Sequence, residues 1–318
     1  MNDFTTRELK DLFDGKHVSA LLPYDSLDAN PQLIHLIQEG NGRLSISGAQ
    51  EKYAVVAEDG RLRLTRKEEN GRFIIKPIPT DRRFLFRDDM PANEALTMSI
   101  ARDIFHLEVA AHGICYLGNG DPVYITRRFD YRSDGAKLGM EDFASLAGLS
   151  ESTHGRDFKY SILSYEDCAL LIQKYCSAPQ VDLLKFYHIL IFNFLFSNAD
   201  AHIKNFSLLE HAPGEYRLAP AYDLLNTQMH IDSPVFALEK GLFKEGTPIT
   251  DTTPIGRQMF QAFGERLGIP QKVIARTLDQ FCTHDEDILN RIQTSLMSEA
   301  AKTDYSRQYL YRRSTLLE

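Results

Sequence analysis

Hydrophobic and polar residues alternate with a period of two in the first third of the chain, which is typical of short strands with one buried face. Between the alternating stretches stand Asp59-Gly60 and Asn70-Gly71, two dipeptides that favour tight hairpin turns. This pattern predicts an antiparallel sheet that is built as a meander. The stretches cover residues 53–57, 61–65 and 73–77, and two further strands are expected near Cys115 and at 123–129.

A helical period follows the first strands. Apolar residues between 93 and 105 recur at a spacing that places them on one side of a helix. Most of the second half also has helical spacing, apart from a strand-like segment at 216–218. A sheet followed by helices predicts an α+β protein of two lobes, with a sheet-containing lobe at 1–130 and a mostly helical lobe at 131–318. The later helices are expected at 164–176, 181–196, 255–267, 270–281 and 285–311.

Composition narrows the class of protein. With 43% hydrophobic and 25% charged residues over 318 positions, the chain has enough apolar material for a sizeable core, which excludes disorder as its main state. The net charge of 36 − 44 = −8 makes it a poor candidate for coating a nucleic-acid backbone. The longest apolar run, at 186–196, is too short to span a membrane, and the N-terminus has no signal-peptide pattern. We therefore expect a cytoplasmic protein without membrane contact.

Metal and disulfide chemistry based on cysteine is not expected. The chain has four cysteines, and no two of them show the CxxC spacing of a zinc site.

The first candidate for chemistry is the segment 44–52, in which small and hydroxyl residues surround Gly48. A loop of this kind exposes backbone N–H groups and can approach phosphate oxygens closely. It contains a single glycine and neither GxGxxG nor GxxxxGK[ST], so an ordinary hairpin remains the alternative.

The second candidate is Lys76, which lies within an apolar strand. A lysine in such a place is costly unless it is paired, and Glu94, near the start of the following helix, is a suitable partner. In protein kinases a lysine of this kind contacts the nucleotide phosphates and a helix glutamate positions it. The alternative is an edge-strand lysine that reaches water.

The third candidate, at 197–206, follows the most apolar predicted helix. Asp200 and Asn205 have the spacing of the catalytic loop of a protein kinase, and Asp223 follows a short strand further on. Phosphoryl transfer needs one group that orients the attacking hydroxyl and two that hold Mg²⁺. Within the loop, His202 is either a packed structural ring or a contact to phosphate or Asp200. Lys204 is a candidate for neutralising the γ-phosphate.

Taken in order, these segments resemble the HipA-type serine/threonine kinases. The resemblance spans roughly residues 43–223 and is carried by six motifs. They are Ser-x-x-Gly-Ala-Gln-Glu-Lys at 45–52, Ile-Lys-Pro at 75–77, Asn-Glu-Ala-Leu at 93–96, Arg-Arg-Phe-Asp at 127–130, Asp-x-His-x-Lys-Asn-Phe-Ser at 200–207 and Ala-Tyr-Asp at 221–223.

The resemblance implies a two-lobed, protein-kinase-like fold and an ATP- and Mg²⁺-dependent toxin kinase. It implies that Lys76 binds the nucleotide phosphates, that Asp200 is the catalytic aspartate and that Asn205 and Asp223 hold the metal. The backbone of Arg127 to Phe129 would form the hinge that meets adenine. The phosphate loop would include Ser45, Ser47, Gly48, Ala49 and Gln50, with Ser45 and Ser47 as sites of autophosphorylation.

The resemblance also implies partners. About forty residues precede the phosphate loop, fewer than the N-terminal subdomain of full-length HipA needs, so the chain is similar to the short HipT form. A separate small protein would then supply that subdomain, and a cognate antitoxin would neutralise the kinase. DNA would be contacted only through the antitoxin, and the implied substrate is an aminoacyl-tRNA synthetase.

Two other functions share these features. One is a non-catalytic, kinase-shaped module that regulates a DNA-bound partner, and the other is a kinase of small molecules. The presence of Asp200, Asn205 and Asp223 favours catalysis, because phosphoryl transfer requires these groups.

Overall fold

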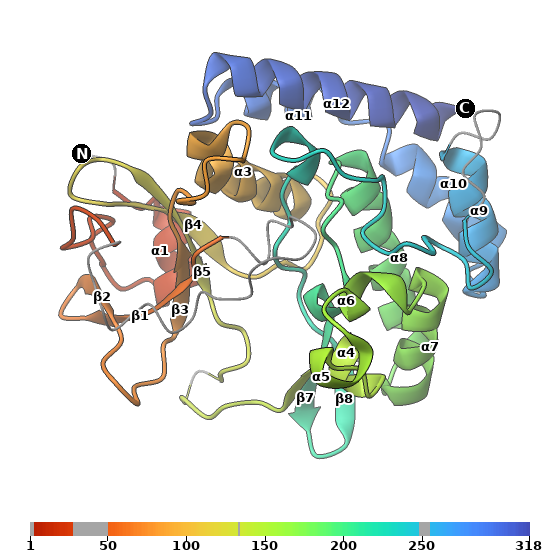
Figure 1. The fold of residues 1–318 in the computed structure, drawn as a ribbon, viewed down its shortest axis with the longest axis horizontal. Helices are drawn as coiled ribbons and strands as arrows, with labels where there is room; N and C mark the ends of the chain where they lie inside the picture. Colours follow the sequence, from red (N-terminus) through yellow and green to blue (C-terminus); the bar gives the residue numbers. More distant parts are fainter. Residues whose placement is uncertain (1–2, 28–49, 133, 248–254) are drawn as a thin grey trace.

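The computed structural model describes residues 3–27, 50–132, 134–247 and 255–318. They form a two-lobed, kinase-like α+β fold, with an antiparallel sheet on one side and a mostly helical lobe on the other (Figure 1). The strands are β1 (Tyr53–Glu58), β2 (Arg61–Leu64), β3 (Phe73–Lys76), β4 (His112–Tyr116), β5 (Pro122–Arg127), β6 (Met140–Asp142), β7 (Ser207–Ala212) and β8 (Glu215–Leu218).

The helices gather mainly in the second lobe, where α8 is the central one (Figure 1). The α-helices are α1 (Thr6–Phe13), α3 (Met90–Asp103), α4 (Phe143–Leu146), α5 (Glu151–His154), α6 (Phe158–Ser161), α7 (Tyr165–Tyr175), α8 (Pro179–Leu195), α9 (Arg257–Arg266), α10 (Gln271–Gln280), α11 (Asp285–Gln293) and α12 (Glu299–Leu317). Short 3-10 turns are η2 (Arg87–Asp89), η3 (Ile203–Asn205) and η4 (Thr227–Met229).

The five-stranded sheet has the order β2-β1-β3-β5-β4, with antiparallel neighbours throughout. The antiparallel sheet is as predicted, but the meander is wrong, because β3 pairs with β1 instead of β2. Asp59 and Gly60 both have positive φ and form the expected tight turn, whereas Asn70-Gly71 does not join two paired strands. The arginine-bearing β2 takes the edge, and the apolar β3 takes the centre, between β1 and β5.

The alternation of β3 decides which side chains reach the space between the lobes. Phe73 and Ile75 belong to the smaller of the two main hydrophobic clusters, which lies between the sheet and α1. Ile74 and Lys76 therefore point to the opposite face, where both line a cleft. The period of two thus places one amine on the functional face of the sheet.

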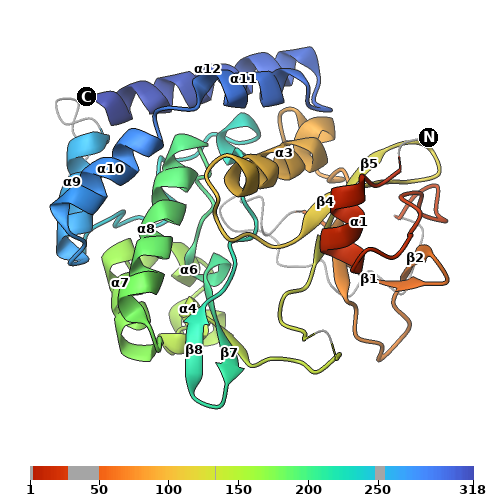
Figure 2. The ribbon, with the colours of Figure 1, turned by 180° about the vertical axis from the view of Figure 1, so that it is seen from behind.

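Helix α1 was not among the predicted elements. It covers the outer face of the sheet (Figure 2) and buries Leu12 and Phe13 there. Its start is marked by a capping box, in which the Thr5 hydroxyl accepts from the backbone N–H of Glu8 and the Glu8 carboxylate accepts from that of Thr5. The Thr-x-x-Glu pattern was therefore a readable signal.

The larger hydrophobic cluster joins α3 to the helical lobe. The single long helix expected at 285–311 is wrong, because the chain breaks it into α11 and α12. Ser298 is the N-cap residue of α12, and its hydroxyl caps the first turn of the helix. Its backbone N–H donates to Asp89 at 2.6 Å. This hydrogen bond links the start of α12 to the segment before α3. From there α12 runs along one side of the molecule (Figures 1 and 2).

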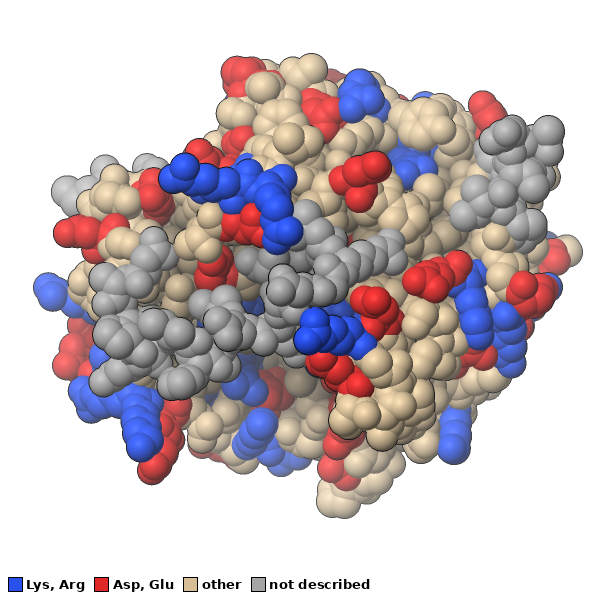
Figure 3. Space-filling view, viewed as in Figure 1, with Lys and Arg blue, Asp and Glu red and all other residues tan. Residues whose placement is uncertain are grey.

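Three further features of the described residues bear on the class of protein. In the described part of the chain, no helix combines the length and the apolar run needed to cross a membrane. The four cysteines are buried and unpaired. Acidic and basic side chains are interspersed over the face shown in Figure 3.

Candidate active site

A cleft of about 550 Å³ lies between the sheet and the helical lobe. Its walls come from β3, from the segment that follows β5, and from the loops around η3 and after β8. Seven of the predicted site residues line it together although they are far apart in the chain, whereas Gln50, Glu94 and Asp200 do not line it. The seven are Lys76, Arg127, Phe129, His202, Lys204, Asn205 and Asp223.

Lys76 stands at the centre of an ion-pair network. Its Nζ lies 2.6 Å from Oε1 of Glu94 and 2.6 Å from Oδ1 of Asp223, and it sits 5.3 Å from the ring centre of Tyr124 on the adjacent strand β5. Burial alone would lower the pKa of Lys76, but the two carboxylates more than offset that effect and raise it above its usual value. The side chain is therefore a permanent buried cation.

The carboxylate of Asp223 also forms an ion pair with a second lysine, which was not among the predicted site residues. Lys52, immediately before β1, places its Nζ 3.4 Å from Oδ2 of Asp223 and lines the cleft. Burial would raise the pKa of Asp223, but Lys52 and Lys76 together hold it well below its usual range. Its backbone has φ of 54°, a left-handed conformation that is costly for a non-glycine residue and that tends to occur at functional sites. Lys52 ends the Gln-Glu-Lys motif, so the signal was present.

Glu94 is buried on α3, and burial raises its pKa although Lys76 opposes the shift. The neighbouring Asn93 fixes this helix to the segment after Asp223. The amide nitrogen of Asn93 donates to the carbonyl of Asn226 at 2.9 Å, and its amide oxygen accepts from the Asn226 N–H at 3.0 Å. Thr97, one turn further on, bonds to Tyr305 of α12 at 2.8 Å. These hydrogen bonds fix α3, and with it Glu94, relative to the segment that follows Asp223.

We expect Asn93→Ala to lower the free energy of unfolding by about 2–4 kcal/mol, because the change leaves the buried backbone N–H and C=O of Asn226 without partners. Chemical denaturation would measure it. The matched control is Asn119→Ala, which removes an exposed amide from a surface turn and should change stability by less than about 0.5 kcal/mol. Equal effects of the two changes would contradict this role for Asn93.

The loop after α8 carries Asp200, which is nearly fully buried. The hydroxyl of Tyr160, on α6, donates to Oδ1 of Asp200 at 2.8 Å. The amide nitrogen of Asn205 donates to the backbone carbonyl of Asp200 at 3.3 Å, which leaves its amide oxygen for another ligand. The backbone carbonyl of Asp223 accepts from the side chain of Asn198 at 3.2 Å, so the two loops are joined directly.

The two basic residues of this loop behave differently. His202 is buried at the cleft wall with its ring edge-on to Tyr160, and neither ring nitrogen has a hydrogen-bond partner among the described residues. Burial, assisted by Lys159, lowers the pKa of His202 well below its usual value, so the ring is neutral at neutral pH. Lys204 is exposed and lines the cleft, while its carbonyl accepts from Tyr222 at 3.0 Å.

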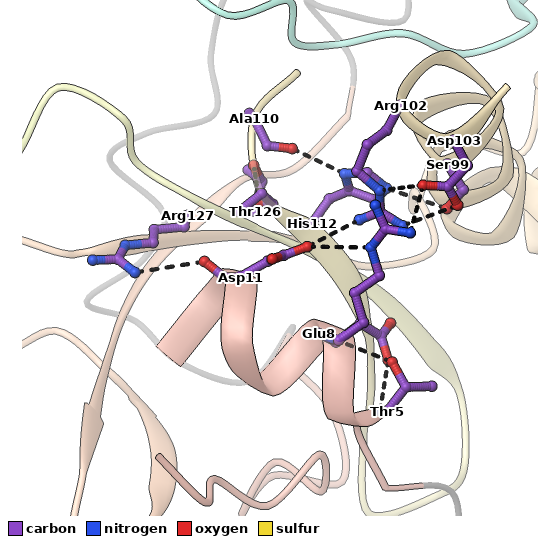
Figure 4. A network of polar contacts seen from close by, with 12 residues as sticks. Thr5, Glu8, Asp11, Ser99, Arg102, Asp103, Ala110, His112, Thr126 and Arg127 are labelled. Carbon is purple, nitrogen blue, oxygen red and sulfur yellow. Dashed lines mark hydrogen bonds and ion pairs between the residues drawn. The ribbon is translucent and has the colours of Figure 1, made fainter. Parts of the chain in front are cut away.

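The predicted hinge also borders the cleft. The guanidinium of Arg127 turns away toward α1, where it meets the carboxylate of Asp14 at 2.7 Å and the carbonyl of Leu12 at 3.2 Å. Figure 4 shows its contact with Asp11 of the same helix. The backbone N–H of Arg127 donates to the carbonyl of Ala111 at 2.8 Å and that of Arg128 to the carbonyl of Arg72 at 2.9 Å, while the Arg127 side chain anchors α1. The ring centre of Phe129, in the predicted hinge, lies 5.4 Å from that of Tyr222, the residue before Asp223. The hinge segment therefore packs against the segment that carries Asp223.

Four residues of the predicted phosphate loop, Ser45, Ser47, Gly48 and Ala49, lie outside the described residues. Gln50, the next residue, is buried, and its amide nitrogen has no partner within the described structure. Glu51 accepts from the backbone N–H of Thr80 at 3.3 Å, which fixes the chain where it enters β1.

The donor set fits a nucleotide with a divalent ion. Asn205 and Asp223 offer oxygen ligands of the kind Mg²⁺ prefers, and such ions are usually held by one or two side chains together with substrate phosphates. No group of three or more His, Cys, Asp or Glu side chains in the described ranges could hold a metal by itself. A shared site is therefore the arrangement these residues suit.

Comparison with known proteins identifies one family and relatives that are named as kinases. The family model for the HipA-like C-terminal domain matches residues 44–288. The protein Y4mE of Sinorhizobium fredii, which carries the name of a kinase, is 30% identical over 278 residues, covering 84% of this chain and 61% of that protein. The serine/threonine-protein kinase toxin HipA of Shewanella oneidensis is 25% identical over 256 residues, covering 76% and 55%. The chain thus spans little more than half the length of these relatives.

Solved structures share the fold. HipA of Shewanella oneidensis, determined with HipB and operator DNA, superposes with a TM-score of 0.70 at 23% identity, covering 88% of this chain and 67% of that one. The kinase CtkA of Helicobacter pylori superposes with a TM-score of 0.53 at 15% identity, covering 91% and 92%. At these identities the likeness concerns the fold alone.

Proposed function

This chain belongs to the HipA-like C-terminal domain family, and from that premise we propose that it is an ATP- and Mg²⁺-dependent protein serine/threonine kinase. The observation that carries the proposal is the meeting of three distant residues. Lys76 contacts both Glu94 and Asp223 at 2.6 Å, and Lys76 and Asp223 line a cleft together with Asn205. Kinases use such a set to hold a nucleotide.

Each residue has a role that follows from its position. Lys76 is held by Glu94 and offers a fixed positive charge to the nucleotide phosphates. Lys52 and Lys204 add further charge at the cleft wall. The Arg127–Phe129 segment, which borders the cleft, is proposed to meet the adenine, with the Arg127 side chain directed toward α1. Positioning and electrostatic stabilisation of this kind supply most of the rate enhancement in phosphoryl transfer.

Asp200 orients the attacking hydroxyl in this proposal and accepts its proton. The hydrogen bond from Tyr160, at 2.8 Å, fixes the orientation of its carboxylate. Asn205 and Asp223 would hold Mg²⁺, which neutralises charge on the phosphate oxygens when it is bound. His202, which is neutral and has no described partner, is proposed to contact the nucleotide or the substrate hydroxyl.

The proposed biological setting is a toxin–antitoxin system in the cytoplasm. The solved HipA relative belongs to a toxin–antitoxin complex with HipB and operator DNA, which supports a cognate antitoxin as partner. Contact with DNA only through that antitoxin is proposed on the basis of the family resemblance. We propose an aminoacyl-tRNA synthetase as the substrate, on the basis of the family resemblance. The same resemblance underlies Ser45 and Ser47 as sites of autophosphorylation.

The test is incubation with γ-labelled ATP and Mg²⁺, with and without a bacterial lysate, followed by phosphopeptide mass spectrometry. We expect label on Ser45 or Ser47 and on at least one lysate protein, and none in Asp200→Asn. Label on a small molecule and on no protein would favour a small-molecule kinase. No transfer by the parent, with ATP bound, would favour a non-catalytic module.

A further inference from the structure

A second cavity, of about 280 Å³, lies on the other side of the loop that carries Asp200. It opens between the segment after η4 and the last helix, α12, which runs along one side of the molecule (Figures 1 and 2). Its lining is mainly polar and includes Ser197, Gln228 and Arg312. None of the residues discussed for phosphoryl transfer lines it.

Arg312 gives this cavity a positive charge. It is half-buried, and one of its terminal nitrogens donates to Oε1 of Gln228 at 2.8 Å, while its guanidinium lies 5.2 Å from the ring centre of Phe194. Within the described ranges, no carboxylate lies within ion-pair distance of Arg312. Arg307, at the rim, is paired with Asp304, and the exposed Asp232 is the one acidic residue of the lining. A partly buried cation without a counter-ion favours an anionic ligand.

Three buried polar atoms of the lining also have no partner among the described residues. They are the hydroxyls of Ser197 and Ser233 and Oε1 of Gln308. The orientation of the Gln308 amide is set by its nitrogen, which donates to Asp304 at 2.7 Å. Ser197 is 2% exposed, so its hydroxyl cannot easily be satisfied by bulk water. Buried polar groups are normally paired, and a ligand would pair these.

We propose that this cavity is a binding site for a phosphate group, either free or on a phosphorylated side chain. The free N–H groups of Arg312 and the two serine hydroxyls are donors for phosphate oxygens. The oxygen of Gln308 is an acceptor, which suits the P–O–H of a singly protonated phosphate. A carboxylate has no such proton, so it would leave Gln308 unpaired.

The site is joined to the catalytic loop through Ser197. The carbonyl of Ser197 accepts from the backbone N–H groups of Thr227 at 3.2 Å and Gln228 at 3.3 Å. The Thr227 hydroxyl in turn accepts from the N–H of Ala199, next to Asp200, at 2.7 Å. A phosphate held between Ser197 and Arg312 would therefore brace the segment that positions Asp200, and the cavity is a candidate regulatory site.

The test measures phosphate binding in the absence of ATP, so it does not depend on the kinase activity proposed above. Isothermal titration at constant ionic strength uses sodium phosphate in one arm and a short phosphoserine peptide in the other. We expect Arg312→Gln and Ser233→Asp to raise the dissociation constant at least about tenfold, since one removes a charge-assisted hydrogen bond and the other adds a negative charge. Ser233→Asp also guards against a folding defect in Arg312→Gln.

Two control variants locate the binding. Arg276→Gln changes an exposed arginine on α10 and should bind phosphate within about twofold of the parent if charge acts locally. Lys52→Met changes a lysine of the nucleotide cleft, so weaker binding by this variant identifies phosphate that is bound in that cleft instead. Tighter binding of the peptide than of free phosphate would identify a phosphorylated chain as ligand, and the reverse would identify the free anion. Absence of binding by the parent, or weakening by Lys52→Met without weakening by Arg312→Gln, would overturn the proposal.

Discussion

Replacing Asp200 with Asn is expected to lower the rate of phosphoryl transfer by about a hundredfold to ten-thousandfold, the range typical of a lost general base. The amide keeps the size of the side chain and can still accept from Tyr160, but it cannot take a proton from the substrate hydroxyl. Nucleotide affinity should change by less than about threefold, because Asp200 does not line the cleft that Lys76 and Asp223 share. Single-turnover kinetics with a labelled nucleotide would measure both quantities.

A matched control is available nearby. Asp157→Asn changes an exposed aspartate at the start of α6, the helix that carries Tyr160, and should leave the rate within about twofold of the parent. The role of Asp200 would be refuted by an Asp200→Asn protein that transfers phosphate at the parental rate. A loss shared equally by Asp157→Asn would point to disturbance of the loop instead.

The second large effect is expected from Lys76→Met, which should abolish measurable nucleotide binding and lower the free energy of unfolding by about 3–5 kcal/mol. The reason is that Glu94 is fully buried and Lys76 is its ion-pair partner at 2.6 Å. Methionine fills a similar volume without charge. Denaturant titration and nucleotide titration would measure the two effects separately.

The double variant Lys76→Met with Glu94→Gln separates stability from function. Removing both charges avoids an unpaired buried carboxylate, so much of the lost stability should return. Nucleotide binding should not return, because the phosphates still lack the amine. If the double variant bound nucleotide like the parent, the phosphate-binding role of Lys76 would be wrong.

Several local features were readable because they depend on neighbours in the chain. The alternation around Lys76 predicts a strand, and its apolar setting indicates that the lysine needs a partner. The Asp59-Gly60 turn was read correctly, since positive φ at both positions is a local preference. The capping box at Thr5 is equally local and marks the start of α1, which was not among the predicted elements.

Other features depended on competition between distant segments. The order of the strands depends on the pairing of β3 with β1 and with the distant β5, which turn dipeptides do not encode. Lys52 was missed as a site residue, because its pairing with Asp223 spans 171 positions and arises only when the sheet meets the loop after β8. The break between α11 and α12 likewise depends on Asp89, far earlier in the chain.

The chain alone therefore determined the chemistry on offer: an amine in an apolar strand, two carboxylates and an amide at spacings that suit phosphoryl transfer, and the family to which they point. Local residue type and spacing suffice for this, because they set backbone preference and available donors. Tertiary structure alone decided that Asp223 pairs with both Lys52 and Lys76, which face of the sheet holds the cleft, and that Arg312 lies half-buried without a counter-ion beside Ser197. Those outcomes follow from burial and electrostatic pairing between segments more than a hundred residues apart, which no local pattern encodes.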